Sequence, residues 1–216
     1  MNPYNLRFTC HSEFTEEDKG IMQHMSKKIL VINSNPAKES FGRALAEAYA
    51  AGAKEAGAEV QLLHLIDLKF DPILWGGDKS TQEMEPDLIK AQELIKWTDH
   101  LVIVVPVWWA NVPALLKGFI DRVFTVGWAY KFTGPNKWAK YLTKKTSYFI
   151  ITTGGPALYY RFLLRNPIAK FLGRDVLGFC GFGKYGSTII GGLVDATPGK
   201  CKEKLKKIKN LGRKQT

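Results

Sequence analysis

The sequence has no apolar run long enough to span a bilayer. A transmembrane helix needs about 20 apolar residues, whereas the longest run here, residues 101–110, has the length of a buried strand. The first residues also lack the apolar core of a secretory signal, because Glu13, Glu16, Glu17 and Asp18 interrupt them. We therefore expect a cytoplasmic protein without a transmembrane segment, and peripheral membrane contact is left open.

Cysteine and metal-binding patterns are also sparse. The three cysteines, Cys10, Cys180 and Cys201, are odd in number and far apart, with no CxxC pair and no histidine at metal-ligand spacing. A disulfide framework or a zinc site would need such spacing. The sequence therefore predicts free thiols and no metal centre.

The composition indicates one domain with an uneven charge. With 216 residues, of which 45% are apolar, the chain can bury a sizeable core, which excludes a disordered or fibrous protein. The net charge is +11, and residues 200–216 carry eight basic groups and one acidic group, a net +7. Because Leu205 and Ile208 share one helical face, we expect residues 200–214 to form a solvated basic helix, and no nucleic-acid partner. Residues 1–26 lack periodicity and are predicted to be a mobile leader, with Met25 as an alternative start.

Strand and helix patterns alternate from residue 27 onward. Short buried-strand runs are followed by apolar residues at helical spacing. Pro86 and Pro113 each suit the first position of a helix, where the missing N–H of proline costs nothing. Such alternation is typical of an α/β fold with a parallel sheet covered on both faces. Residues 66–85 are expected to make an irregular excursion over the sheet edge. The predicted strands are residues 29–33, 59–64, 101–107, 147–153 and 187–191, and the predicted helices are residues 40–56, 86–97 and a segment that begins at Pro113.

Three loops are expected to meet at one edge of this sheet. Doubly wound sheets bind ligands beyond the carboxyl ends of their strands, where the strand order reverses. The loops that follow the first, third and fourth strands are residues 34–41, 106–111 and 152–160. If these loops converge, they form one binding site.

The first loop suits a phosphate group. Ser34, Asn35 and Ser40 surround a helix start, where unpaired N–H groups and the helix dipole favour an anion. The loop contains neither GxGxxG nor GxxxxGK[ST], which argues against a Rossmann dinucleotide site and a P-loop. Ser40 acting only as a helix cap explains this loop equally well, and Lys38 is either a phosphate partner or a solvated lysine.

The other two loops suit a planar ring. Trp108 and Trp109 are adjacent, and burying both would be unusual, so an aromatic wall beside a ring is one interpretation. One core Trp and one interface Trp is the other. Gly154 and Gly155 let backbone N–H groups approach a ligand closely, although a plain turn at the strand end accounts for them as well.

Several motifs resemble the NAD(P)H:quinone oxidoreductases, the DT-diaphorase-like family of flavodoxin-fold reductases. They occur in the family's order across residues 28–182, and the stretch from Pro106 to Phe124 is the most specific. The resemblance implies a flavodoxin-like, doubly wound parallel sheet of five strands in the order 2-1-3-4-5, with helices on both faces. The residues that carry it are 28–32, 39–41, 70–74, 106–124, 151–155 and 179–182.

The resemblance also implies a function and a site. It implies a homodimer with bound flavin that takes hydride from NAD(P)H and passes it to a quinone or related aromatic acceptor. Tyr160 resembles the pocket tyrosine that stabilises reduced flavin and is the expected catalytic residue. The expected cofactor-binding residues are Asn35, Ser40, Phe41, Gly42, Pro106, Val107, Trp108, Trp109, Ala110, Thr152, Thr153, Gly154 and Gly155.

Two positions depart from the family pattern. Asn35 stands where the family commonly has a histidine that contacts adenine, which favours FMN over FAD although FAD stays open. Asn166 stands where a pocket histidine follows the tyrosine, and an amide cannot act as an acid near neutral pH. A proton relay from tyrosine to histidine is therefore not supported.

Other classes of function remain as alternatives. A flavodoxin-type electron carrier, or a flavoprotein that regulates a transporter, would use the same fold without reducing quinones. The aromatic side chains around the site favour the enzyme, because they suit an aromatic substrate. A scaffold whose basic tail binds nucleic acid is a third class, and its binding would be lost on deleting residues 200–216.

Overall fold

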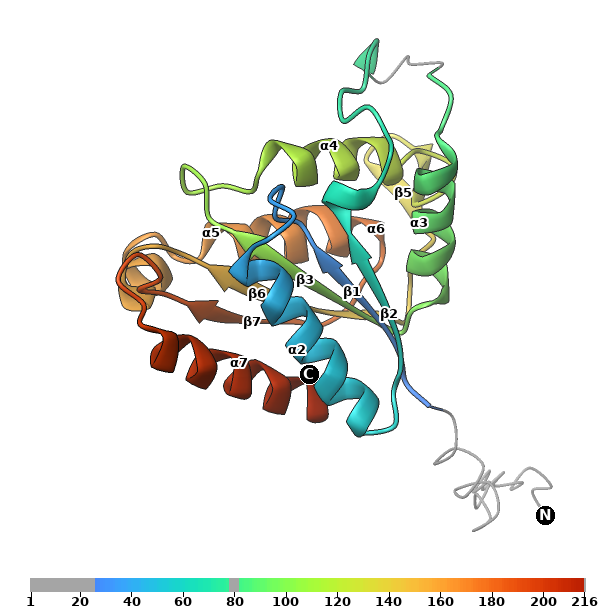
Figure 1. The fold of residues 1–216 in the computed structure, drawn as a ribbon. Coiled ribbons are helices and arrows are strands. Elements are labelled where there is room, and N and C mark those ends of the chain that lie inside the picture. The colour runs from blue at the N-terminus through green and yellow to red at the C-terminus, as the bar shows by residue number, and fades with distance from the viewer. Residues whose placement is uncertain (1–25, 78–81, 216) are drawn as a thin grey trace, which may run out of the picture.

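The structure, a computed structural model, describes residues 26–77 and 82–215. Its centre is a five-stranded sheet in which every strand runs parallel to its neighbours (Figure 1). When the five strands of this sheet are numbered along the chain, their order across the sheet is 2-1-3-4-5, which confirms the predicted order. Across the sheet they are β2 (Glu59–His64), β1 (Lys28–Asn33), β3 (His100–Pro106), β6 (Thr146–Thr152) and β7 (Tyr185–Ile190).

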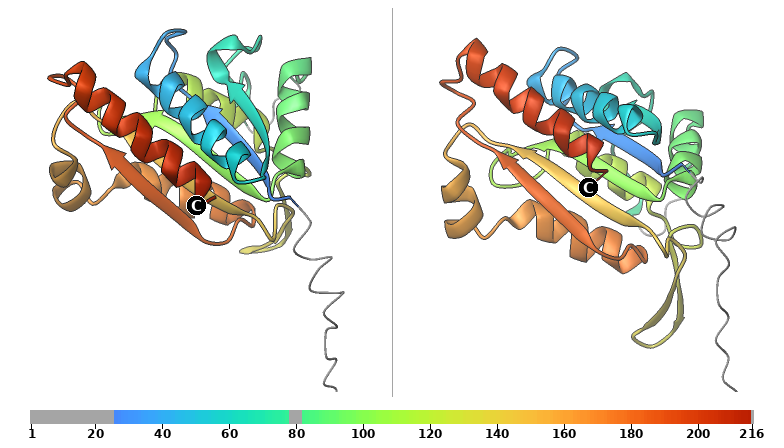
Figure 2. Two further views of the ribbon diagram at one scale, coloured as in Figure 1. Left: turned by 60° about the horizontal axis from the view of Figure 1, so that its bottom comes forward. Right: turned by 90° about the horizontal axis from the view of Figure 1, so that it is seen from below.

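Alternate residues of the central strands pack into two separate clusters. Ile29 and Val31 of β1 join a cluster with α2 (Phe41–Glu55) and α7 (Pro198–Arg213), whereas Leu30 and Ile32 join one with α3 (Pro86–Trp97) and α4 (Ala114–Val123). Successive side chains of a strand point to opposite faces, so an all-apolar run such as that of β1 buries both faces. The views in Figure 2 show α2 and α7 lying together on one side of the sheet.

The predicted basic helix is present as α7, and it packs closely on α2. Ile208 of α7 is fully buried against this interface, while Lys206 and Lys207 are exposed. Glycines bring the two backbones together, since a Cβ on Gly52 would overlap the carbonyl oxygen of Lys209. This helix is therefore part of the fold as well as a charged surface.

The excursion after β2 is held by a buried arginine. After the short helix η1 (Leu65–Asp67), the chain passes over α4, where Arg122 is only 2% exposed. The Arg122 guanidinium forms an ion pair with Glu85 at 2.6 Å and also donates to the carbonyl of Asp71 at 2.6 Å. Residues 70–74 and 119–122 belong to the segments on which the family resemblance rests. Their contacts here give them a structural role in this fold.

Two features were not predicted from the sequence. A hairpin of β4 (Tyr130–Gly134) and β5 (Lys137–Lys140) forms a separate two-stranded sheet. A helical stretch also links β6 to β7; its parts are η3 (Tyr159–Leu163), α5 (Pro167–Lys170), η4 (Phe171–Leu177) and α6 (Gly178–Cys180).

The predicted leader, residues 1–26, lies outside the described residues except for Ser26. Among the helices of the described chain, none is long and apolar enough to cross a membrane.

Candidate functional site

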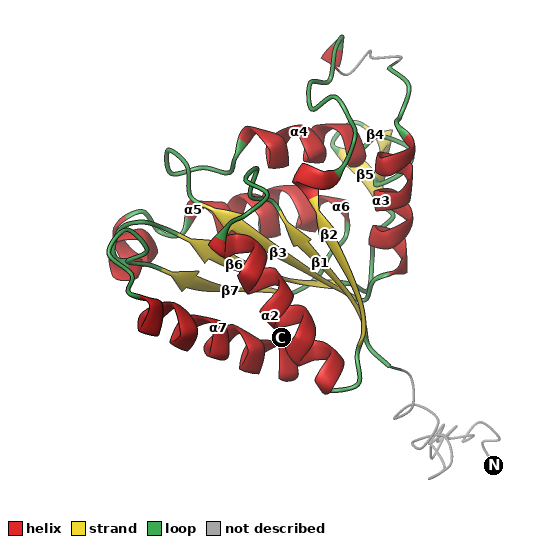
Figure 3. Ribbon diagram, in the orientation of Figure 1, coloured by secondary structure: helices red, strands yellow, loops and turns green. Residues whose placement is uncertain are grey.

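The three predicted loops lie side by side at the carboxyl edge of the sheet. The amide and hydroxyl of Ser34 both donate to the carbonyl of Val104, at 3.0 and 2.9 Å, which joins the end of β1 to β3. The amide of Val107 donates to the carbonyl of Thr152 at 2.8 Å, which joins the end of β3 to β6. Figure 3 shows these loops at the tips of the parallel strands. The structure therefore brings the predicted site segments together.

The first loop presents a row of unpaired backbone donors. The Asn35 side-chain oxygen accepts from the amide of Ala37 at 2.9 Å, and Ser40 caps α2 by accepting from the amide of Arg43 at 3.2 Å. Between these bonds, the N–H groups of residues 38–42 donate to no acceptor in the described part of the chain. Successive free amides at a helix start form a concavity that favours an anion such as a phosphate.

Buried polar groups support this loop from below. Asn33 and Ser34 are fully buried, and the Asn33 side-chain oxygen accepts from the amide of Asn35 at 3.3 Å. Gly42 lies close above it, because a Cβ there would stand 3.2 Å from the same oxygen. The loop backbone is thus tied to the end of β1, which sets the direction of its free N–H groups.

The tryptophan loop is a tight turn with an unusual backbone. Trp108 and Asn111 exchange two backbone hydrogen bonds of 2.9 Å, and the two residues between them, Trp109 and Ala110, have φ angles of 51° and 60°. Positive φ at both central positions normally requires Gly, Asn or Asp. The turn leaves Trp109 fully exposed and Trp108 about half exposed (47%) beyond the buried Pro106.

The glycine loop is open on the side that faces solvent. Thr152 is buried and Thr153 half-buried, whereas Gly154 and Gly155 are exposed. A Cβ on Gly155 would meet nothing within 4 Å, and the amides of both glycines donate to no acceptor in the described chain. The loop therefore presents two N–H groups without an acceptor at an exposed position of the described chain.

Tyr160 is placed in the core and not on the exposed edge. It is 2% exposed, and its hydroxyl accepts from the amide of Ile168 at 3.4 Å. Burial raises the pKa of this phenol above its usual range, although the bond from Ile168 opposes the shift. Asn166, at the place of the family's histidine, donates to the hydroxyl of Ser187 at 2.9 Å. The Asn166 side-chain oxygen is buried and has no hydrogen-bond partner among the described residues.

Sequence reasoning missed a group of exposed apolar side chains next to the glycine loop. The helical turn after Gly155 and the loop after β7 both carry them, and Val194 of the latter would contact a Cβ on Gly154. The bulky sequence of this segment, Tyr-Tyr-Arg-Phe-Leu-Leu-Arg, was the available signal. The exposed side chains are Leu158, Tyr159, Phe162, Leu163 and Val194.

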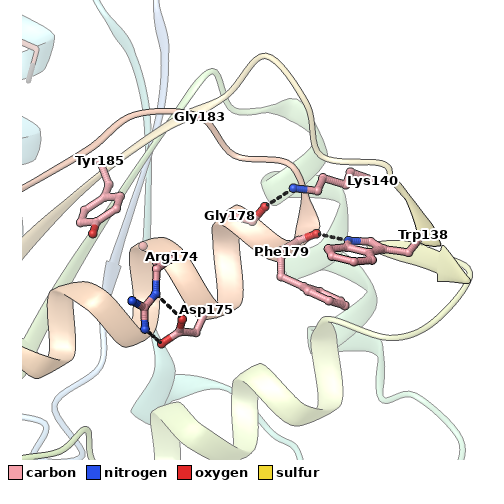
Figure 4. A pocket seen from close by; sticks show the side chains of 9 residues that line it. Trp138, Lys140, Arg174, Asp175, Gly178, Phe179, Gly183 and Tyr185 are labelled. Carbon is pink, nitrogen blue, oxygen red and sulfur yellow. Dashed lines mark hydrogen bonds and ion pairs between the residues drawn. The ribbon is translucent and has the colours of Figure 1, made fainter. Parts of the chain in front are cut away.

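A cavity of about 520 Å³ lies elsewhere, at the amino end of β7 (Figure 4). Its polar groups bond to the surrounding protein: Lys140 donates to the carbonyl of Gly178 at 3.0 Å, and Trp138 donates to that of Phe179 at 3.0 Å. These bonds satisfy carbonyls at the end of a helix, which is a structural role. The loops at the carboxyl edge, with their free donors, are the stronger candidate site.

Fold and site geometry together define an α/β protein of the flavodoxin type, with its candidate binding edge at the carboxyl ends of the strands. Residues 27–211 match the family described as "Flavodoxin-like fold", and the chain belongs to this family. It is 28% identical over 179 residues to "NAD(P)H dehydrogenase [quinone] 1" of Cavia porcellus, a match covering 72% of this chain and 65% of that relative. The chain thus spans just under two thirds of this relative's length. The resemblance read from the motifs is confirmed.

Two solved structures have the same fold. The NAD(P)H:quinone oxidoreductase from Methanothermobacter marburgensis has a TM-score of 0.77 at 22% identity, covering 89% of this chain and all of that one. An FMN-dependent NADH-azoreductase from Bacillus anthracis, solved in complex with FMN, has a TM-score of 0.66 at 18% identity, covering 88% of this chain and 99% of that one.

Proposed function

We propose that this chain is a flavin-dependent NAD(P)H oxidoreductase that reduces quinones or related aromatic acceptors. The observation that carries the proposal is the carboxyl edge itself, where free amides of residues 38–42, the exposed Trp108 and Trp109, and the open Gly154–Gly155 turn lie on neighbouring loops. The similarity to a quinone-reducing NAD(P)H dehydrogenase supports the same activity.

The groups present at this edge fit a flavin mononucleotide. The amides at the start of α2 would hold the phosphate, together with Ser40, Phe41 and Gly42. The segment from Pro106 to Ala110 would lie against the ring, and Thr152 to Gly155 would meet its polar edge. Because the side-chain oxygen of Asn35 already accepts from the amide of Ala37, that oxygen is not free to accept from an adenine, and we favour FMN over FAD.

The chemistry of hydride transfer would come from the flavin, which takes hydride from NAD(P)H and delivers it to the acceptor. This chain would supply binding and orientation. The free amides of Gly154 and Gly155 would donate to the ring edge where negative charge develops on reduction, which stabilises the reduced form. The exposed indole of Trp109 would provide a flat apolar surface for an aromatic substrate.

Tyr160 is proposed as a positioning residue in this site. Its buried ring and its bond to the amide of Ile168 hold the segment that follows Gly155. A direct role in proton transfer would require the hydroxyl to turn out of the core. Replacing Tyr160 by Phe, with the exposed Tyr159→Phe as the matched control, separates the two roles: a positioning residue changes flavin affinity, whereas a proton donor changes the rate of flavin reoxidation by quinone.

We also propose that the protein is a homodimer in the cytoplasm. Ile73, Trp75, Val126 and Phe132 are at least half exposed, and Val126 lines a cavity of about 500 Å³ near the end of α4. A second copy that covers these side chains would remove apolar surface from water. Light scattering of the purified protein, with Phe132→Ser expected to weaken the dimer, tests this assembly.

The enzymatic proposal is tested by identifying the chromophore and following its two half-reactions. We expect a yellow protein whose released chromophore co-elutes with FMN on chromatography. NAD(P)H should bleach the flavin absorbance, and a water-soluble benzoquinone should restore it. A flavin that NAD(P)H does not reduce would indicate an electron carrier instead, and a colourless protein that takes up no FMN would refute the proposal.

A further inference from the structure

Large apolar side chains point into solvent from the helical turn that follows the glycine loop. Tyr160 and Leu164 of this turn face the core, while the residues between and before them face outward. A folded domain rarely exposes a contiguous apolar patch unless a partner or a membrane covers it. The outward side chains are Leu158, Phe162 and Leu163, each 69% exposed, and Tyr159, 54% exposed.

Basic residues flank this apolar patch, and acidic residues are missing from it. Arg161 and Arg165 are exposed, and Arg165 lines a small cavity together with Lys170. None of these three cations is in an ion pair within the described chain. Residues 122–174 contain no Asp or Glu at all. The one acidic group in the neighbouring loop after β7 is Asp195, beside the exposed Val194.

We propose that residues 158–165 form a docking surface for an anionic lipid bilayer. Segments that lie in the membrane interface combine Leu, Phe and Tyr on one face with flanking Arg and Lys, which contact anionic headgroups. A second copy of this chain fits less well, because a symmetric contact across this patch would place Arg161 and Arg165 against the same cations of the other copy. The net charge of +11 favours an anionic partner surface.

The position of the patch also indicates the class of electron acceptor, an inference that rests on the proposed function. The turn leaves the sheet directly after Thr152 and the glycine loop, at the end of the molecule where β6 and β7 terminate (Figures 1 and 2). Docking there brings the carboxyl edge to the bilayer surface. The acceptor class would then be a lipid-soluble quinone that reaches the site from the membrane.

The test is flotation of the purified, flavin-loaded protein with lipid vesicles. We expect the protein to float with vesicles of phosphatidylcholine and phosphatidylglycerol in a 3:1 ratio, to float at least tenfold less with pure phosphatidylcholine, and to be released by high salt. Two double variants probe the patch: Phe162→Ser with Leu163→Ser removes apolar surface, and Arg161→Gln with Arg165→Asn removes charge. Asn suits position 165 because its φ is 56°.

The matched control is Lys206→Gln with Lys207→Gln on α7, which removes the same charge from an exposed surface elsewhere. Both patch variants should lose vesicle binding about tenfold, and the α7 variant should keep it. Equal loss in the α7 variant, or undiminished binding of the Phe162 and Leu163 variant, would overturn the proposal. So would a change from dimer to monomer in that variant, which would assign the patch to a second copy. Flotation requires no turnover, so it is independent of whether the protein reduces quinones.

Discussion

At the scale of single residues, the candidate site stores strain in the tryptophan turn. Ala110 has a φ of 60°, a region that costs a residue with a Cβ about 1 kcal/mol or more. Ala110→Gly should therefore stabilise the flavin-free protein by about 0.5 kcal/mol, after the greater backbone entropy of glycine in the unfolded chain is subtracted. The control Ala51→Gly, at an exposed position inside α2, should destabilise it by about 1 kcal/mol. Denaturant unfolding measures both, and equal losses in the two variants would contradict the role of strain.

The exposed indole in the same turn leads to a prediction about binding. Trp109 is fully exposed, so Trp109→Ala should leave the free energy of unfolding unchanged within about 0.5 kcal/mol. If the indole lies against bound flavin, its loss should raise the Kd for FMN roughly fivefold, as expected for one aromatic contact. Tyr141, 45% exposed and outside the three loops and the proposed dimer surface, provides the control Tyr141→Ala, which should leave the Kd unchanged. Fluorescence titration of the flavin-free variants decides between these outcomes.

At the scale of elements, the sequence was sufficient to predict those helices and strands whose own residues show a clear local pattern. The predicted ranges of β2 and α3 agree with the structure. Pro86 fixes the start of α3, and the apolar residues Leu88, Ala91 and Ile95 of this helix recur at helical spacing.

The hairpin β4–β5 was missed because its strands have only five and four residues and are mostly exposed, so the short alternation from Tyr130 to Thr133 is a weak signal. The burial of Tyr160 could not be predicted, because it depends on tertiary packing. The positive φ of Trp109 could not be predicted either, because the two central positions of the turn from Trp108 to Asn111 lack the Gly, Asn or Asp that such a backbone normally requires.

The contact between α2 and α7 depends on one glycine in each helix. A Cβ on Gly52 would overlap the carbonyl of Lys209, so Gly52→Ala should push the helices apart. We expect a loss of roughly 2 kcal/mol or more in unfolding free energy, since overpacking outweighs the higher helix propensity of alanine. Gly199→Ala is the control, because a Cβ there meets nothing within 4 Å and should be neutral or slightly stabilising. Thermal unfolding of the two variants checks this, and a neutral Gly52→Ala would mean that α7 is loosely attached.

At the scale of the whole molecule, stability should fall in two steps as the pH is lowered. His100 is 4% exposed, with one ring nitrogen 2.7 Å from the hydroxyl of Thr146 and the other without a partner among the described residues. Burial, aided by the positive charge of Lys27, lowers the pKa of His100 from 6.5 to about 4. Because protonation then favours the unfolded chain, stability is complete above pH 6.5 and is lost as the pH falls toward 4, by about 3 kcal/mol at most.

The second step belongs to the excursion held by Arg122. Burial alone would raise the pKa of Glu85, but hydrogen bonds from the amide of Asp71 and from Arg122 lower it below 4.5. A carboxylate with a lowered pKa stabilises the fold above pH 4.5 and loses this effect only as the pH falls further, so its window lies below most of the His100 window. Urea unfolding between pH 7 and 3 should show both. His100→Asn should reduce the slope of the profile between pH 6.5 and 4.5 and leave both the contribution of His64, whose pKa burial also lowers, and the acid loss below pH 4.5. An unchanged slope in that range would show that His100 does not titrate there.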